Sequence, residues 1–182
     1  MTGPSLSSDV MRLLHDIEQR SQRVDDRLSH HNERQATWTA VNFQVAKNTY
    51  LTPLKQIQEI FPLPEQITLI PFAKPWVYGV INLRGDLLPL FDLNYFLYGK
   101  ATKIRKQSKI LVINYQNLYS GVVVDAVIGL KHFQSTPDTK TVNQDVRIST
   151  YLNGNITQND KSWDIFSFHK LTTDQRFLNI AE

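Results

Sequence analysis

The feature of the sequence that most constrains its fold is a series of about ten short apolar runs separated by turn residues. In the first of these runs Val41, Phe43 and Val45 alternate with polar residues, and this period of two is typical of a half-buried strand. No long helical pattern lies between the runs. Strands joined by short turns, without crossover helices, predict an all-β fold rather than a parallel α/β sheet.

The remaining strands are predicted from runs rich in β-branched and aromatic residues. Arg84-Gly85-Asp86 is a plausible hairpin turn, and Asn153-Gly154-Asn155 predicts another because Asn and Gly tolerate positive φ. Short helical segments are expected at 94–98 and 168–177. The expected strands cover residues 41–45, 49–51, 57–61, 78–83, 87–91, 110–114, 119–124, 127–133, 146–152 and 162–168.

A basic segment at 99–109 divides five of these strands from the other five. A run of like charge is usually a solvated loop, and here it is also the best internal boundary. The count predicts two packed five-stranded β-barrels, the first at about 38–98 and the second at about 108–170, in one domain of 38–182. The segment contains Lys100, Lys103, Arg105, Lys106 and Lys109, and no acidic residue.

Residues 1–37 have a different pattern. Apolar side chains recur at helical spacing and predict an amphipathic helix followed by a linker. Two interpretations stay open: the helix packs on its own domain, or it docks on a partner. The residues of the apolar stripe are Val10, Leu14, Ile17, Val24 and Leu28.

Composition excludes several classes of protein. Among the 182 residues 41% are hydrophobic and 20% are charged, which is typical of a globular protein. The absence of cysteine excludes disulfides and thiolate metal sites. No apolar run approaches the ~20 residues of a membrane helix, and charged residues near the start exclude a secretory signal, so we expect a cytoplasmic protein without direct membrane insertion.

The sequence contains no recognisable catalytic, cofactor or metal motif. Its seven glycines are scattered, and there is neither an HExxH nor a nucleophile elbow. Asp92 and Asp125 each follow an apolar strand and could form the acid/base pair of a hydrolase, although such residues more often accept bonds from loop N–H groups. The basic segment leaves open an alternative, a β-barrel nucleic-acid-binding protein, but no aromatic residue is interleaved with its charges.

Two blocks of sequence carry a family resemblance. Residues 78–93 read Tyr-Gly-Val-Ile-Asn-Leu-Arg-Gly-Asp-Leu-Leu-Pro-Leu-Phe-Asp-Leu, and residues 121–127 read Gly-Val-Val-Val-Asp-Ala-Val. Both resemble the signature of the CheW family of chemotaxis coupling proteins. Pro75-Trp76 and the stretch 163–171 resemble the branch of this family that serves type IV pili and twitching motility. Ser167 departs from the pattern, since much of the family carries Asp in its last strand.

The resemblance implies a two-barrel fold and a non-catalytic adaptor without cofactor or metal. Family members couple a methyl-accepting chemotaxis receptor to a CheA-type histidine kinase, docking on the regulatory domain of the kinase, and nucleic acid is not among their partners. Carried over to this sequence, the family pattern predicts that Glu59 and Arg84 pair with each other at the centre of the partner-binding surface. The predicted partner-binding residues are Ile57, Glu59, Asn82, Arg84 and Gly85.

Overall fold

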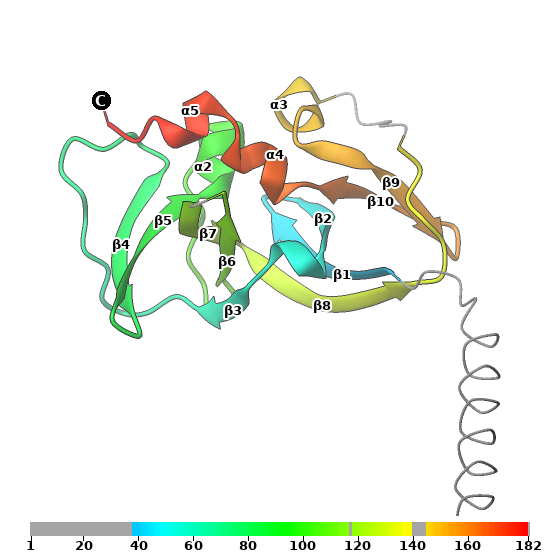
Figure 1. Ribbon diagram of the computed structural model, residues 1–182, viewed down its shortest axis with the longest axis horizontal. Coiled ribbons are helices and arrows are strands. Elements are labelled where there is room, and N and C mark those ends of the chain that lie inside the picture. The colour runs from blue at the N-terminus through cyan, green and yellow to red at the C-terminus, as the bar shows by residue number, and fades with distance from the viewer. Residues whose placement is uncertain (1–37, 117, 140–144, 182) are drawn as a thin grey trace, which may run out of the picture. The chain divides into compact units, whose positions relative to one another are not determined.

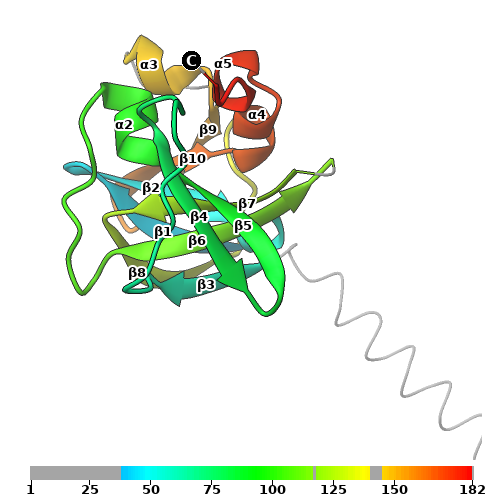
Figure 2. The same ribbon diagram turned by 90° about the vertical axis from the view of Figure 1, so that its left-hand side faces the viewer.

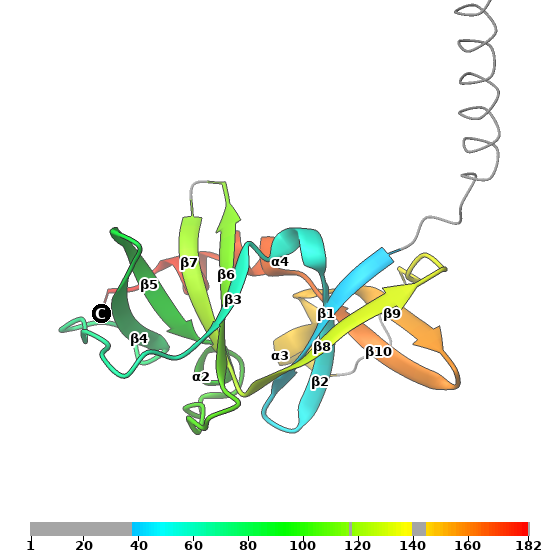
Figure 3. The ribbon, with the colours of Figure 1, turned by 90° about the horizontal axis from the view of Figure 1, so that it is seen from below.

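A computed structural model describes residues 38–181 except 117 and 140–144, and the predicted N-terminal helix and linker lie outside the described residues. The described chain forms two five-stranded sheets, which lie side by side (Figures 1 and 3). In spatial order, sheet A consists of β8 (Ala126–Phe133), β1 (Trp38–Val45), β2 (Asn48–Pro53), β10 (Lys161–Phe166) and β9 (Leu152–Gln158). Sheet B consists of β3 (Glu59–Pro62), β6 (Lys109–Tyr115), β7 (Leu118–Val124), β5 (Asp86–Asp92) and β4 (Val77–Leu83).

The helical elements of the described chain are short, and four of them gather over one end of the sheets (Figures 1 and 2). The side chains of Asp92, Asp145, Ser167 and Asp174 each accept a backbone N–H at the start of one of these four, as expected for N-cap residues. The helical elements are η1 (Leu54–Gln56), α2 (Leu93–Tyr98), α3 (Val146–Ser149), α4 (Phe168–Thr172) and α5 (Gln175–Leu178).

The predicted all-β fold of two five-stranded units is confirmed, but the expected division into barrels at about 38–98 and 108–170 is wrong. Sheet A takes β1 and β2 from the first half of the chain and β8, β9 and β10 from the second. The cause is parallel pairing of β2 with β10, which a hairpin cannot produce and which requires strands distant in sequence. The basic segment therefore connects α2 to β6 within sheet B and is not a boundary between the two units.

The strand predicted at 146–152 is also wrong. Asp145 accepts the backbone N–H of Arg147 and starts α3 there, while Val146 is exposed and supplies no buried face. The Asn-Gly pair lies inside β9 and forms no turn. The hairpin turn between β9 and β10 is made by Asn159 and Asp160, whose φ angles of 51° and 58° are those of a type I′ turn.

The buried side chains form three clusters, and the largest is shared between the two sheets. This shared core takes Val41 and Phe43 from β1 of sheet A and Leu111 and Ile113 from β6 of sheet B. The alternate residues of β6, Ile110 and Val112, point into a smaller cluster inside sheet B. A strand that is buried on both faces needs apolar residues at successive positions. This explains the continuous apolar runs of β6 and β7.

The C-terminal helices complete the shared core. Phe168 of α4 packs on Phe43 at a ring separation of 5.7 Å, and Phe177 of α5 packs on Phe91 at 4.6 Å. The side-chain carbonyl of Gln56, in η1, accepts the backbone N–H of Phe168 at 2.8 Å and ties the start of α4 to the chain before β3. The expected helical closure near the C-terminus is thus observed as two short helices.

Gly154 offers a test of this fold. Its φ is +89°, and a Cβ at this position would collide with the backbone carbonyl of Asp138, which pairs with Asn155. We expect Gly154→Ala to lower the free energy of unfolding by about 3 kcal/mol or more, measured by urea denaturation. Gly129→Ala is the matched control, because Gly129 also has positive φ but faces open space, and we expect about 1 kcal/mol. Equal losses for the two variants would contradict the predicted collision.

The N-terminal segment offers a second test. The buried clusters described here are built from residues after position 37. We therefore expect a protein lacking residues 1–36 to keep a single cooperative thermal transition, followed by circular dichroism. Loss of cooperativity in the truncated protein would show that the segment belongs to the core.

Candidate partner-binding site

The Asn-Leu-Arg-Gly motif builds the tight turn between β4 and β5. Arg84 and Gly85 occupy the two turn positions with φ of 56° and 99°, as a type I′ hairpin requires. The side-chain carbonyl of Asn82 accepts the backbone N–H of Gly85 at 2.8 Å. Asn82 and Gly85 thus shape the turn, and the turn presents the Arg84 side chain at its tip.

Arg84 pairs with Glu59, as the sequence predicted. Its Nη2 donates a hydrogen bond to Oε1 of Glu59 at 2.7 Å. Glu59 begins β3 and Arg84 follows β4. These are the two edge strands of sheet B, so the ion pair connects the two edges of the sheet. The position of Arg84 between Leu83 and Gly85, among apolar strands, predicts a partly shielded guanidinium. This prediction is wrong, because the tip of the turn leaves 75% of the Arg84 side chain exposed, against 28% for Glu59.

Ile57 has a different environment from the other predicted site residues. It is half-buried and packs against the shared core, directly after η1. The neighbouring backbone N–H of Gln58 donates to the carbonyl of Val112 at 2.8 Å. These contacts place the start of β3, and with it Glu59, at a fixed position on sheet B. We therefore expect Ile57 to position Glu59 and not to contact a partner itself.

Leu87 is a candidate contact residue that sequence reasoning missed. It is paired with Asn82 across the β4–β5 hairpin and is 71% exposed, so an apolar side chain lies near Arg84 on the open face. The missed signal was the period of two in β5, where Leu88 and Leu90 point inward. Leu87, one position before them, must point outward.

Asp92 and Asp125 have structural roles, as favoured from the sequence. Asp92 is buried and accepts hydrogen bonds from Tyr95 N–H at 3.0 Å and from both the N–H and the hydroxyl of Thr102 at 2.7 Å. Asp125 accepts the backbone N–H of Ala46, at 2.6 Å, in the β1–β2 turn. The two carboxylates line different cavities. An acid/base pair made by these residues is therefore contradicted.

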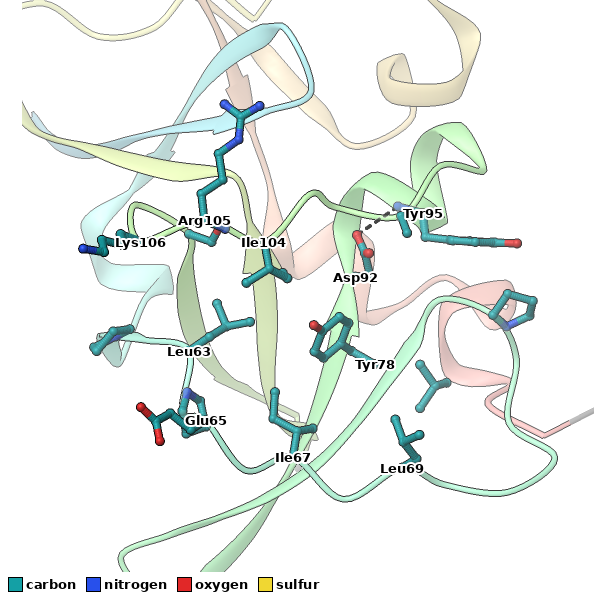
Figure 4. A pocket seen from close by; sticks show the side chains of 16 residues that line it. Leu63, Glu65, Ile67, Leu69, Tyr78, Asp92, Tyr95, Ile104, Arg105 and Lys106 are labelled. Carbon is teal, nitrogen blue, oxygen red and sulfur yellow. Dashed lines mark hydrogen bonds between the residues drawn. The ribbon is translucent and has the colours of Figure 1, made fainter.

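The cavity beside Asp92 is largely apolar. It has a volume of about 880 Å³ and lies between the 63–76 loop and the segment after α2 (Figure 4). Burial raises the pKa of Tyr78, and the nearby charge of Asp92 raises it further. No group of three or more side chains suited to hold a metal ion occurs within the described ranges. Labelled side chains in the cavity include Leu63, Ile67, Leu69, Tyr78 and Ile104.

Ser167, where the resemblance noted in the sequence leads us to expect Asp, has a capping role in the structure. Ser167 is buried at the end of β10, and its hydroxyl accepts the backbone N–H of Lys170 as the N-cap of α4. Ser and Asp are both preferred N-cap residues. The substitution therefore preserves the start of α4 and the position of Phe168.

The two sheets, the parallel strand pairs and the Asn-Leu-Arg-Gly turn define the class of protein. The chain matches the CheW-like domain family over residues 39–176 and belongs to this family. The assignment made from the sequence is confirmed, and the chain is a CheW-like protein of the chemosensory scaffold class.

Individual relatives agree with this assignment. The chain is 32% identical to Protein PilI of Pseudomonas aeruginosa over 178 residues, which cover 96% of this chain and 99% of PilI. It is 30% identical to Chemotaxis protein CheW of Helicobacter pylori over 66% of this chain and 73% of that protein. The crystal structure of the scaffolding protein TtCheW from Thermoanaerobacter tengcongensis superposes with a TM-score of 0.62 at 25% identity, over 76% of this chain and 94% of TtCheW.

None of the helices in the described part of the chain has the length and apolar character needed to cross a membrane.

A structural role for Asp92 predicts a large effect on stability. Asp92→Ala removes the N-cap of α2 and leaves the Thr102 donors unpaired, so we expect a loss of about 2–4 kcal/mol in the free energy of unfolding. Asp92→Asn keeps one acceptor oxygen and should lose less. Chemical denaturation of both variants checks the order, and the reverse order would contradict the assigned hydrogen bonds.

Proposed function

We propose that this protein is a non-catalytic adaptor that couples a methyl-accepting chemotaxis receptor to a CheA-type histidine kinase. The observation that carries the proposal is the β4–β5 turn, which presents Arg84 to solvent while Glu59 holds its guanidinium. A charge fixed in this way loses little further side-chain entropy when a partner binds. Exposed Leu87 adds an apolar contact beside it.

The pathway that we propose is the chemosensory control of type IV pili. Its support is the sequence resemblance to the pilus branch and the similarity to PilI along nearly the full length of both chains. The match to the CheW of Helicobacter pylori covers a smaller part of this chain.

Coupling requires that the adaptor hold the kinase in a defined orientation relative to the receptor. Receptor conformation can then bias kinase activity, because the contacts differ in free energy between the two receptor states. A rigid adaptor transmits such a bias better than a mobile one. In this chain the shared core and the ion pair between the edges of sheet B supply that rigidity near Arg84.

The role of Arg84 is tested by binding to the regulatory domain of the CheA-type kinase from the same system, measured by isothermal titration calorimetry. We expect Arg84→Ala to weaken binding by about tenfold or more, as at interface positions enriched in Arg. An exposed ion pair contributes at most about 1 kcal/mol to stability, so the melting temperature should fall by no more than about 4 °C.

The matched control is Arg176→Ala. The Arg176 side chain is 72% exposed and forms an ion pair with Asp174 at 3.0 Å, but it lies on α5 and also contacts Tyr151 and Phe96, so only its affinity and not its stability is compared with Arg84→Ala. We expect this variant to bind the kinase domain normally. If Arg84→Ala lowers the melting temperature sharply and leaves affinity intact, the ion pair only closes sheet B and does not recognise the partner.

A further inference from the structure

The loop between β3 and β4 carries the most exposed aromatic side chain of the described residues. Phe72 is 87% exposed, and its φ of 56° lies in the left-handed region, which bulky side chains rarely adopt. A residue persists in such a conformation only where the surrounding structure enforces it, and residues of this kind gather at binding sites. A large apolar side chain that is held in solvent in this way indicates a contact with a partner.

Backbone hydrogen bonds hold the loop on both sides of Phe72. Before it, Thr68 exchanges two backbone hydrogen bonds with Val80 of β4, at 2.8 and 2.9 Å. After it, the N–H of Lys74 donates to the carbonyl of Ile180 at 2.9 Å, so the C-terminal segment lies beside the loop (Figure 1). Phe72 is therefore placed before any partner arrives, and binding does not need to order the loop.

The apolar cavity described above opens beside the same loop. Leu69 and Pro75, which lie on either side of Phe72 in the sequence, both line the cavity, whereas Phe72 does not. The opposite wall is the segment after α2, from which Ile104 points toward Tyr78 (Figure 4). With a volume of about 880 Å³ the cavity is large enough for a Phe side chain. One end of sheet B thus carries an apolar projection and an apolar hollow next to each other.

The exposed apolar surface around the cavity is large enough for a protein contact. Leu69 is 76% exposed, and Ile70 and Ile104 are exposed to a smaller extent. At about 150–200 Å² for a fully accessible side chain of this size, these three residues and Phe72 expose roughly 400 Å². A standard interface takes about 800 Å² from each partner, and somewhat more than half of it is apolar. The patch therefore supplies most of the apolar area that a stable contact needs.

We propose that this end of sheet B is a contact between two copies of the chain, in which Phe72 of each copy enters the apolar cavity of the other. A two-fold axis between the projection and the cavity forms both pairs at once, because an isologous contact uses the same surface twice. A small apolar ligand would fill the cavity but leave Phe72 in solvent. A partner must supply both a hollow and a projection to match this surface, and a second copy necessarily supplies both.

The inference goes beyond the Arg84 surface, which lies at the β4–β5 turn. It does not rest on the proposed function, since the contact needs neither kinase nor receptor.

The first test is sedimentation velocity of the full chain between about 1 µM and about 200 µM, where we expect a reversible equilibrium between monomer and dimer. Phe72→Asn removes the contact twice in each dimer. At about tenfold for each contact, we expect the dissociation constant to rise about a hundredfold. The melting temperature should stay unchanged or rise, because Asn adopts positive φ more readily than Phe. Val146→Asn, at an 80% exposed position on α3, is the matched control and should change the dissociation constant by less than about twofold.

A mixing experiment tests whether the two copies exchange Phe72. Ile104→Glu places a charge in the cavity and leaves Phe72 unchanged, so this variant alone should also dimerise about a hundredfold more weakly than the unaltered chain. In an equimolar mixture of Ile104→Glu and Phe72→Asn, Phe72 of the first protein can enter the intact cavity of the second. One of the two contacts is then restored, and we expect the mixed dimer to form about tenfold more tightly than a dimer of either variant alone.

Three outcomes overturn the inference. They are a chain that stays monomeric up to about 200 µM, equal weakening by Phe72→Asn and Val146→Asn, and a mixture that dimerises no more tightly than the separate variants. If Phe72→Asn weakens binding of the kinase domain while the unaltered chain is monomeric, the surface serves the kinase, so this inference fails and the proposed function stands. If the mixed dimer forms and the kinase domain does not bind, the proposed function fails and the contact between copies stands.

Discussion

The structure depends on one hydrophobic core that two sheets share. Strands β1, β5, β6 and β7 each direct one set of side chains into this core and the alternate set into the interior of their own sheet. Neither sheet can therefore bury all of its apolar surface without the other. Phe168 of α4 and Phe177 of α5 are buried in the same core. The C-terminal helices therefore contribute to its packing, as the first strand does.

The geometry of the candidate site depends on this packing and on one tight turn. Glu59 is positioned because Ile57 is anchored in the shared core, and Arg84 is positioned because Asn82 and Gly85 form a turn that few other residues permit. The ion pair between Glu59 and Arg84 then joins the two edge strands of sheet B. This arrangement leaves an exposed, oriented charge of the kind that is suited to recognition.

Local chemistry explains which sequence-based predictions succeeded. The period of two in β1, the turn at Arg84 and Gly85 and the role of Asp92 as an acceptor for backbone N–H groups depend on residues close in sequence, and all three are observed. The Asn-Gly prediction failed because Gly154 is needed for a different reason, the close approach of Asp138 to β9. The exposure of Arg84 was wrongly predicted because the hairpin places this residue at the tip of its turn, where the neighbouring strands do not cover it.

The sequence by itself determined the fold class, nine of the ten strands in the described residues, and the family, whose resemblance in turn predicted that Glu59 and Arg84 form a pair. The strands follow from local periodicity and turn chemistry, whereas the family and the pair follow from the resemblance carried by residues 78–93 and 121–127. Only the tertiary structure decided which strands form each sheet, because parallel pairing of β2 with β10 and of β5 with β7 joins segments that no local pattern relates. It also decided that the 63–76 loop and the segment after α2 enclose one apolar cavity, since that juxtaposition requires the chain to fold back on itself after α2.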